Sequence, residues 1–251
     1  MPGDRRAEAT PSFRRLGPAM TVQVVRSVLS QGALEIAGIT LIADVSGALF
    51  WAEQSLLVVS DLHLEKGSSF AARGVLLPPY DTAATLGRLA AVVAYYDPRT
   101  VIALGDSFHD RDAHGRLAPA DRDAISALQA RRDWIWISGN HDPELPRDLG
   151  GVVASEVAIG PVMFRHEPTG AFGEISGHLH PKARVTTRGR AMERRCFASD
   201  GDRAVMPAFG AYAGGLSIRD GAFAKIFQSL AFIAHVLGDN RLHAIAASRC
   251  R

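Results

Sequence analysis

Residues 56–63 read LLVVSDLH: four consecutive apolar residues, then a serine, and then Asp61 and His63 on either side of a leucine. A short apolar run that ends in polar residues is typical of a buried β-strand. The pattern recurs at residues 100–106 (TVIALGD) and 134–142 (WIWISGNHD). Because the carboxyl ends of parallel strands meet at one edge of a sheet, we expect these three polar clusters to lie close together.

Helical sequences separate the three predicted strands. Asp81 is predicted to be the N-cap of a helix that runs to about Tyr96, and a second helix is predicted for residues 119–131. Shorter strand-like pieces follow at residues 157–159, 162–165, 174–177, 183–187, 196–198 and 204–208. Residues 222–237 are interpreted as a strand followed by a helix. The order predicts an α/β fold in which a mixed sheet packs on a second sheet, with helices outside.

The composition is that of a globular protein. Of 251 residues, 47% are hydrophobic and 22% are charged, which excludes a disordered or fibrous chain. The two cysteines, Cys196 and Cys250, have no paired spacing, so a disulfide framework and a cysteine zinc knuckle are excluded as well. No apolar run reaches the length of about 18 residues that a membrane span needs, and no apolar signal region follows Arg5 and Arg6. We therefore expect a cytoplasmic protein.

The first twenty residues differ in character from the rest. Residues 1–20 hold four arginines, three prolines and two glycines without a hydrophobic period. We interpret them as a flexible basic extension, the alternative being a basic arm that contacts nucleic acid. Residues 21–251 are predicted to form a single domain.

Two later clusters, residues 165–167 (RHE) and 177–180 (GHLH), add histidines to those at the strand ends. The candidate metal ligands are then Asp61, His63, Asp106, Asn140, His166, His178 and His180. Imidazole, carboxylate and amide donors suit borderline-hard divalent metals, and this set is too large for one four-coordinate zinc. It suits two ions about 3.5–4 Å apart that share one carboxylate. Glycines precede three of the ligands, where they are expected to permit tight turns.

The order of these motifs carries a resemblance. Asp-X-His, Gly-Asp, Gly-Asn-His-Asp, a lone His and Gly-His-X-His resemble the signature of the calcineurin-like metallophosphoesterases. Residues 61–67 (DLHLEKG), 76–82 (LLPPYDT), 177–181 (GHLHP) and 207–212 (PAFGAY) resemble the DNA-ligase-associated members. This resemblance implies a four-layer αββα sandwich and a manganese-dependent DNA endonuclease of the bacterial DNA damage response. It also implies a functional association with an ATP-dependent DNA ligase, a large helicase and an exonuclease.

The resemblance also implies a role for each residue. The ligands divide into Asp61, His63 and His180 for one ion, Asn140, His166 and His178 for the other, and Asp106 as the bridge. His141 is the general acid, Asp142 orients its ring, and His109 contacts the scissile phosphate. A histidine at position 109 favours a nuclease over a phosphoprotein phosphatase. Arg165 departs from the pattern, because the wider family has a glycine before the ligand at position 166.

Other functions remain open from the residues alone. A small-molecule phosphatase or nucleotide pyrophosphatase would use the same metal set, whereas a non-enzymatic scaffold is disfavoured because the set is complete. Manganese follows from the resemblance, and iron or zinc would fit the same donors. Residues 182–195 carry six basic residues and one glutamate. They are interpreted either as a hairpin with exposed arginines or as a surface that attracts phosphates.

Overall fold

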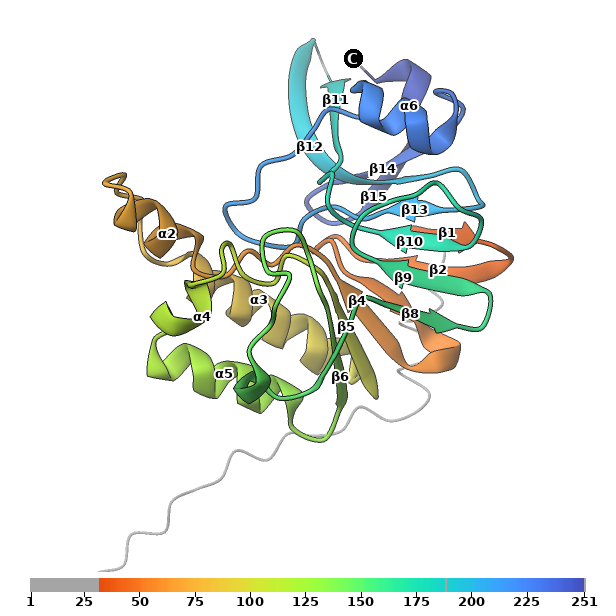
Figure 1. Cartoon of the computed structure of the whole chain (residues 1–251). Coiled ribbons are helices and arrows are strands. Elements are labelled where there is room, and N and C mark those ends of the chain that lie inside the picture. Colours follow the sequence, from red (N-terminus) through yellow and green to blue (C-terminus); the bar gives the residue numbers. More distant parts are fainter. Residues whose placement is uncertain (1–31, 188, 251) are drawn as a thin grey trace, which may run out of the picture.

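The computed structural model describes residues 32–187 and 189–250, and the predicted basic extension at residues 1–20 lies outside these ranges. Within them, two β-sheets pack face to face and helices cover both outer faces (Figure 1). The layers run helix, sheet, sheet, helix. The predicted αββα sandwich is therefore confirmed.

The first sheet carries the strands that the sequence places before the site. In the described residues its strand order follows the chain, with antiparallel pairs from β1 to β4 and parallel pairs from β4 to β7. The bounds are β1 (Ala33–Ile36), β2 (Ile39–Ala43), β3 (Leu49–Trp51), β4 (Leu56–Val59), β5 (Thr100–Leu104), β6 (Asp133–Ile137) and β7 (Val152–Ala154). The parallel strands β4, β5 and β6 end side by side, as the polar clusters require.

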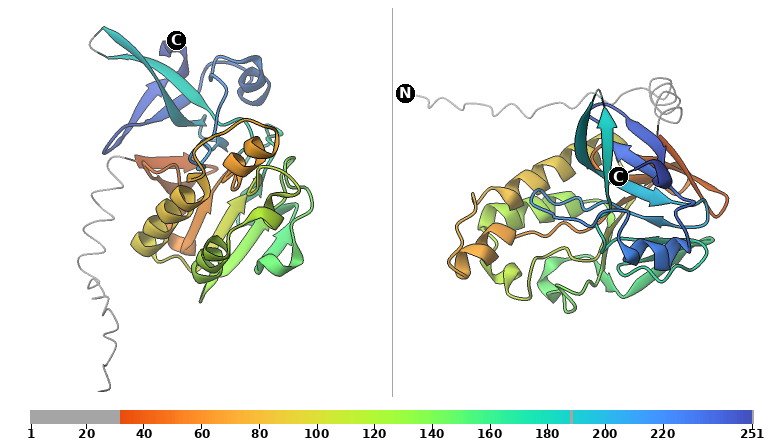
Figure 2. Two further views of the ribbon diagram at one scale, coloured as in Figure 1. Left: turned by 90° about the vertical axis from the view of Figure 1, so that its left-hand side faces the viewer. Right: turned by 90° about the horizontal axis from the view of Figure 1, so that it is seen from above.

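The second sheet has the order β15-β14-β12-β13-β10-β9-β8 in the described residues, and β11 pairs with β12 outside this path. The bounds are β8 (Glu156–Ile159), β9 (Val162–Arg165), β10 (Glu174–Ser176), β11 (Lys182–Thr187), β12 (Arg190–Ser199), β13 (Ala204–Val205), β14 (Ile233–Leu237) and β15 (Leu242–Ala246). The β11–β12 hairpin stands out from the body of the molecule (Figure 2).

The helices differ in length and in what they cover. They are α2 (Lys66–Ala72), α3 (Asp81–Tyr96), α4 (Ala113–Arg116), α5 (Pro119–Gln129) and α6 (Gly221–Phe227). Helices α3 and α5 pack on the outer face of the first sheet and α6 packs on the second, while α2 projects from the body (Figure 1). None of the helices in the described part of the chain has the length and apolar character needed to cross a membrane.

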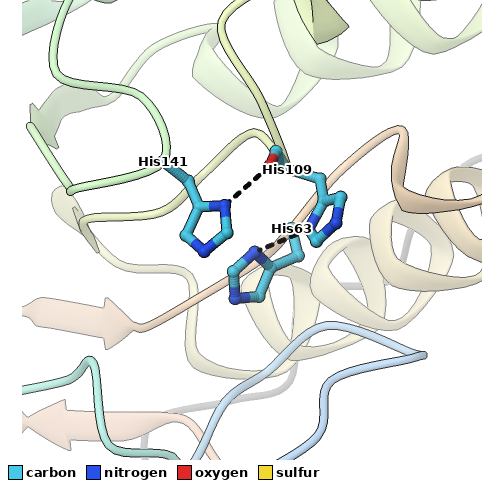
Figure 3. A group of neighbouring side chains, drawn as sticks. All are labelled: His63, His109 and His141. Carbon is cyan, nitrogen blue, oxygen red and sulfur yellow. Dashed lines mark hydrogen bonds between the residues drawn. The ribbon is translucent and has the colours of Figure 1, made fainter. Parts of the chain in front are cut away.

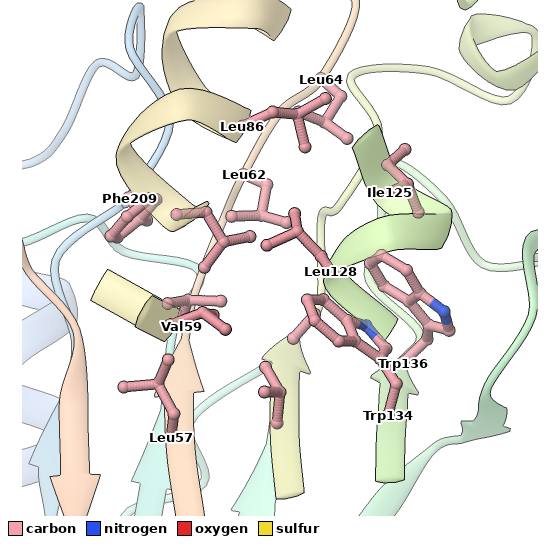
Figure 4. Close-up of a cluster of buried hydrophobic side chains, with 14 of the residues drawn as sticks. Leu57, Val59, Leu62, Leu64, Leu86, Ile125, Leu128, Trp134, Trp136 and Phe209 are labelled. Carbon is pink, nitrogen blue, oxygen red and sulfur yellow. The ribbon is translucent and has the colours of Figure 1, made fainter. Parts of the chain in front are cut away.

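Alternation along the strands supplies both sides of the first sheet with apolar side chains. On β4, Leu57 and Val59 face α3 and α5, whereas Leu56 and Val58 face the second sheet. Figure 4 shows Trp134 and Trp136 in the helix-side cluster, with Leu86, Ile125 and Leu128 from the two helices above them. Both indoles are buried, so these two tryptophans are core residues. The strand ends that carry the site are thus held from both faces.

Several predicted boundaries were wrong. Asp81 is the first residue of α3 and not its N-cap, which is Tyr80. The Asp81 carboxylate instead accepts a hydrogen bond from the backbone of Gly67, 2.9 Å away, and so links α2 to α3. Helix α5 ends at Gln129, two residues before the predicted end.

Residues 222–237 were assigned in the wrong order, because the helix comes before the strand. The Asp220 side chain accepts a hydrogen bond from the backbone of Ala222 and caps α6, whose buried side chains are Phe223, Ile226 and Phe227. That spacing is helical. Strand β14 follows. In it Ile233 is exposed, whereas Ala234, Val236 and Leu237 are buried. The sequence analysis also did not predict β1 to β3, β7, β15, α2 and α4.

Phe164 on β9 gives a direct test of the packing between the two sheets. Its ring is 1% exposed and lies in the cluster formed by the facing sheets. We expect Phe164→Ala to lower the free energy of unfolding by about 3–5 kcal/mol, because it leaves a cavity where the structure cannot close. Urea unfolding at one fixed metal concentration measures this change. Val152→Ala, at a side chain that is 64% exposed, should change the free energy by less than about 0.5 kcal/mol.

Candidate metal centre

The polar clusters meet at the carboxyl ends of three parallel strands. Asp61 and His63 follow β4, Asp106 follows β5, and Asn140 follows β6. The loops after β9 and β10 bring in the other three candidate ligands, His166, His178 and His180. The structure therefore brings all seven candidate ligands to one place, from segments that are far apart in the sequence.

One group of donors consists of Asp61, His63 and His180, whose donor atoms lie within 4.8 Å of one another. The Nε2 atoms of His63 and His180 are 3.3 Å apart, and Asp61 Oδ1 is 3.1 Å from His180 Nε2. The Asp61 carboxylate is fully buried and is further held by the hydroxyl of Ser60 and the backbone N–H of His178. Three donor atoms thus face one small space.

The second group consists of Asp106, His166 and His178, again with donor atoms within 4.8 Å. Asn140 joins it, because its Oδ1 lies 3.0 Å from His166 Nε2 and 2.8 Å from His178 Nδ1. His166 Nδ1 donates to the carbonyl of Leu104 at 3.2 Å, which leaves Nε2 free for a metal. Arg165 does not displace His166 from the site, since its guanidinium pairs with Glu156 at 2.8 Å.

Asp106 lies between the two groups. Its Oδ2 is 3.3 Å from His166 Nε2 in one group and 4.0 Å from His63 Nε2 in the other. Its Oδ1 accepts the backbone N–H of His141 at 2.9 Å, which fixes the carboxylate. A carboxylate in this position is suited to bridging two cations.

Most of the donors have protonation states in which they can bind a cation. Burial lowers the pKa of His63 to about 3, so its ring is neutral. Burial opposes the charge of Asp106, but hydrogen bonding to His166 and the nearby histidine charges lower its pKa to about 2. His166 differs: burial lowers its pKa, but Asp106 and Asp61 outweigh burial and raise it to about 9. A bound cation would have to displace that proton, as metals do when they bind imidazole.

Five of the seven candidate ligands adopt a left-handed backbone. The φ angles are 53° at Asp61, 44° at His63, 45° at Asp106, 69° at His178 and 48° at His180. Such angles are uncommon outside glycine and cost on the order of 1–3 kcal/mol each. Their clustering at one site indicates that function, rather than packing, selects this backbone.

The glycines before the ligands serve mainly to make room. A Cβ on Gly105, whose φ is 75°, would overlap the His166 ring. A Cβ on Gly139 would overlap Asp106, and one on Gly177 would overlap Asp61 and the neighbouring serine. A positive φ occurs at Gly105 but not at the other two glycines. The predicted need for tight turns therefore holds at Gly105, and close contact is the reason at Gly139 and Gly177.

His109 and His141 lie beside the first group of donors. Figure 3 shows both rings next to His63, with His141 Nδ1 directed at the carbonyl oxygen of His109, 2.7 Å away. The two rings stack, with their centroids 5.2 Å apart. His141 Nε2 is 4.0 Å from Asp106 Oδ2, and the side chain is 39% exposed. A substrate can therefore reach His141 from solvent.

Asp142 does not orient the ring of His141, contrary to expectation. Its carboxylate accepts the backbone N–H groups of Phe108 and Gly139, both at 3.0 Å, while the carbonyl of His109 holds the ring of His141. Burial raises the pKa of Asp142 to about 7. Asp142 ties the loop after β5 to the loop after β6.

The sequence reading missed Phe70, which forms part of the site's wall. Its ring stacks on that of His109 with centroids 5.8 Å apart. Burial lowers the pKa of His109 to about 4, and the charges of Lys66, His141 and Arg73 add to this effect. Phe70 lies on α2, and because α2 itself was not predicted, no sequence signal pointed to it.

Comparisons with known proteins agree with this geometry. Residues 55–206 match the family model of the calcineurin-like phosphoesterases. The buried His and Asp donor groups define a metal-dependent phosphoesterase, and the chain belongs to the calcineurin-like phosphoesterase family. A comparison with curated protein sequences gave no match.

Several solved structures are similar to the chain. A nuclease, MPE, from Pseudomonas putida is 28% identical with a TM-score of 0.66, and the match covers 86% of this chain and all of that chain (100%). Yfce, a phosphoesterase from E. coli, is 15% identical with a TM-score of 0.38, and the match covers 76% of this chain and 98% of that one.

Gly139 tests how closely the loops must approach. We expect Gly139→Ala to reduce phosphoesterase activity about 10²-fold, because the added Cβ displaces Asp106 from both donor groups. Hydrolysis of an aryl phosphodiester measures the loss. Gly87→Ala, on the exposed side of α3 where a Cβ meets nothing within 4 Å, should keep full activity. Full activity in Gly139→Ala would contradict the assigned geometry.

Proposed function

We propose that the protein is a dinuclear-metal-dependent phosphodiesterase that cleaves DNA as an endonuclease. The observation that carries this proposal is the position of Asp106 between two complete groups of donors. The likeness to the Pseudomonas putida nuclease, over the whole length of that protein, supports a nucleic acid as the substrate.

In this proposal Asp61, His63 and His180 hold one ion, and Asn140, His166 and His178 hold the other, with Asp106 shared. The donors fit such ions because the donor atoms of each set lie close together. Two of the seven residues, Asp61 and Asp106, supply carboxylates. When bound, the ions would supply positive charge for the phosphoryl oxygens and make a nearby water more acidic. We propose manganese from the sequence resemblance; iron and zinc would fit the same donors and are the alternatives.

His141 is proposed to protonate the sugar oxygen that leaves. Its Nδ1–H donates to the carbonyl of His109, so the proton that can be transferred is the one on Nε2. That nitrogen faces Asp106 and is reachable from solvent. The backbone of His109, not a carboxylate, therefore sets the direction in which the acid points.

His109 is proposed to donate a hydrogen bond to an oxygen of the scissile phosphate. His63 Nε2 faces the first donor group, so its proton lies on Nδ1, which is 3.4 Å from His109 Nδ1. When His109 Nδ1 accepts a hydrogen bond from this N–H, the proton of the neutral His109 ring lies on Nε2, from which it can donate a hydrogen bond to a phosphate oxygen. A metal ligand thus fixes the tautomer of the residue beside it.

The setting of this activity is proposed from the sequence resemblance. It comprises cytoplasmic DNA repair in the DNA damage response, and functional association with an ATP-dependent DNA ligase, a large helicase and an exonuclease. These links rest on the motifs at residues 61–67, 76–82, 177–181 and 207–212.

A comparison of substrates tests the proposal. The full chain, loaded with manganese, is incubated with supercoiled circular DNA, with a phosphomonoester and with a nucleotide pyrophosphate. We expect conversion of the supercoiled DNA to the nicked form. Hydrolysis of the small molecules without nicking would instead assign a small-molecule phosphatase or pyrophosphatase.

His141→Ala separates acid catalysis from the rest of the site. We expect a loss of about 10²–10⁴-fold on DNA, whose leaving sugar oxygen needs a proton. The loss on an aryl phosphodiester should be far smaller, because a phenolate leaves without one. The measurement is the hydrolysis rate of the variant on both substrates. His243→Ala, at an exposed histidine, is the control. Equal losses on the two substrates would contradict the assignment of His141 as the general acid.

Asp106→Ala tests the bridge. We expect it to abolish activity and to release both ions, because the carboxylate lies between both groups. Metal analysis by mass spectrometry after gel filtration measures the content per chain. Asp112→Ala, at an exposed loop carboxylate nearby in the sequence, should retain the wild-type content. An Asp106→Ala protein with unchanged metal content would rule out the bridging role.

A further inference from the structure

The β11–β12 hairpin presents charged side chains on one face. It begins two residues after His180, and its register pairs Lys182 with Arg195 and Arg184 with Glu193. Strand alternation puts these four side chains on the same face. The other face is apolar near the sheet, since Ala183 is buried and Val185 packs against the core under α6. The charged face therefore points away from that core.

This face reaches the loop that supports the metal centre. Arg195 Nη1 donates to the carbonyl of Ala208 at 2.7 Å. The next residues of the loop bond to the end of β4, with the Phe209 N–H on Ser60 and the Gly210 N–H on Asp61. The base of the hairpin is thus linked through residues 208–210 to Asp61, a candidate metal ligand.

A second arginine, from α3, contacts the same loop. Arg88 on α3 lies over the Phe209 ring, with its guanidinium carbon 4.4 Å from the ring centre. Its Nε and Nη2 atoms are buried and have no hydrogen-bond acceptor among the described residues. Burial lowers the pKa of Arg88 to about 10, and the nearby charge of Arg195 lowers it further in the same direction.

The charges at this place are not balanced. Within residues 32–187 and 189–250, no carboxylate pairs with Arg88 or Arg195, and Glu193 pairs with Lys182 at 3.1 Å. Two half-buried guanidinium groups near each other repel and are costly without a counter-charge. Guanidinium groups match the oxygens of a phosphate in shape and charge. An anion with several oxygens therefore suits this pair of guanidinium groups.

We propose that Arg88 and Arg195 bind a backbone phosphate of the substrate strand at a subsite beside the metal centre, and that Lys182 and Arg184 continue this subsite along the hairpin. The inference rests on the proposed function, because the phosphate belongs to a polynucleotide. Of the two interpretations of residues 182–195, it favours the phosphate-binding surface for the face that bears Lys182, Arg184 and Arg195.

The test compares single variants of the full chain, Arg88→Gln, Arg195→Gln and Arg184→Gln, in binding a fluorescent DNA oligonucleotide in EDTA over a range of salt concentrations. We expect each to weaken binding about tenfold. Each should also reduce the slope of log affinity against log salt by about 1. Hydrolysis of an aryl phosphodiester by manganese-loaded Arg99→Gln should match wild type. Arg99→Gln, before β5 at the opposite end of the sheet, is the control.

Wild-type DNA affinity and salt slope in folded Arg88→Gln and Arg195→Gln would overturn the inference, with folding checked by thermal melting. Arg184 is exposed, so Arg184→Gln decides the hairpin's part even if the two half-buried positions tolerate no change. Inorganic phosphate forms a second arm. If it stabilises wild type more than the variants while DNA does not distinguish them, the site is one for a free anion and the backbone subsite is wrong.

The result of this binding test can be distinguished from the result of the nicking test of the proposed function. DNA nicking by wild type, with unchanged DNA binding in the variants, removes the subsite and keeps the nuclease. Salt-dependent DNA binding that the variants lose, without any nicking by wild type, keeps the subsite and removes the nuclease.

Discussion

The metal centre brings the lone pairs of its donor atoms together at two neighbouring places. Around Asp106, imidazole nitrogens face one another at 3.2–3.3 Å, together with carboxylate and amide oxygens. Donor atoms held this way repel or share a few protons unless cations lie between them. The left-handed φ angles of five candidate ligands are a second cost of the same arrangement. The sandwich tolerates this cost because large apolar clusters hold both faces of the strands that end there.

The parts of the fold that could be predicted from sequence are those with a strong local pattern. The apolar runs at β4, β5 and β6 stand between clear polar clusters, so both the strands and their common edge were predictable. The same clusters contain the residue types that donate to metal ions, so these donors were predictable as well. Because each ligand follows a strand end or a short loop, convergence of all seven followed from the expected sandwich, and their proximity is what the structure adds.

Other features depend on tertiary contacts that no local pattern encodes. The Asp142 carboxylate accepts one backbone N–H from Phe108 in the loop after β5 and one from Gly139 in its own loop, while the ring of His141 bonds elsewhere. Asp81 bonds to Gly67 instead of capping its own helix. Residues 222–237 are mostly apolar, and the capping Asp220 before them was the signal that should have fixed the order of helix and strand. The approach of Arg88 to Arg195 joins residues more than a hundred positions apart.

Anomalous diffraction from crystals of the full chain grown with manganese tests whether two ions share Asp106. We expect two strong peaks per chain, one among Asp61, His63 and His180 and the other among Asn140, His166 and His178, with the Asp106 carboxylate touching both. A single peak, or peaks away from Asp106, would contradict it.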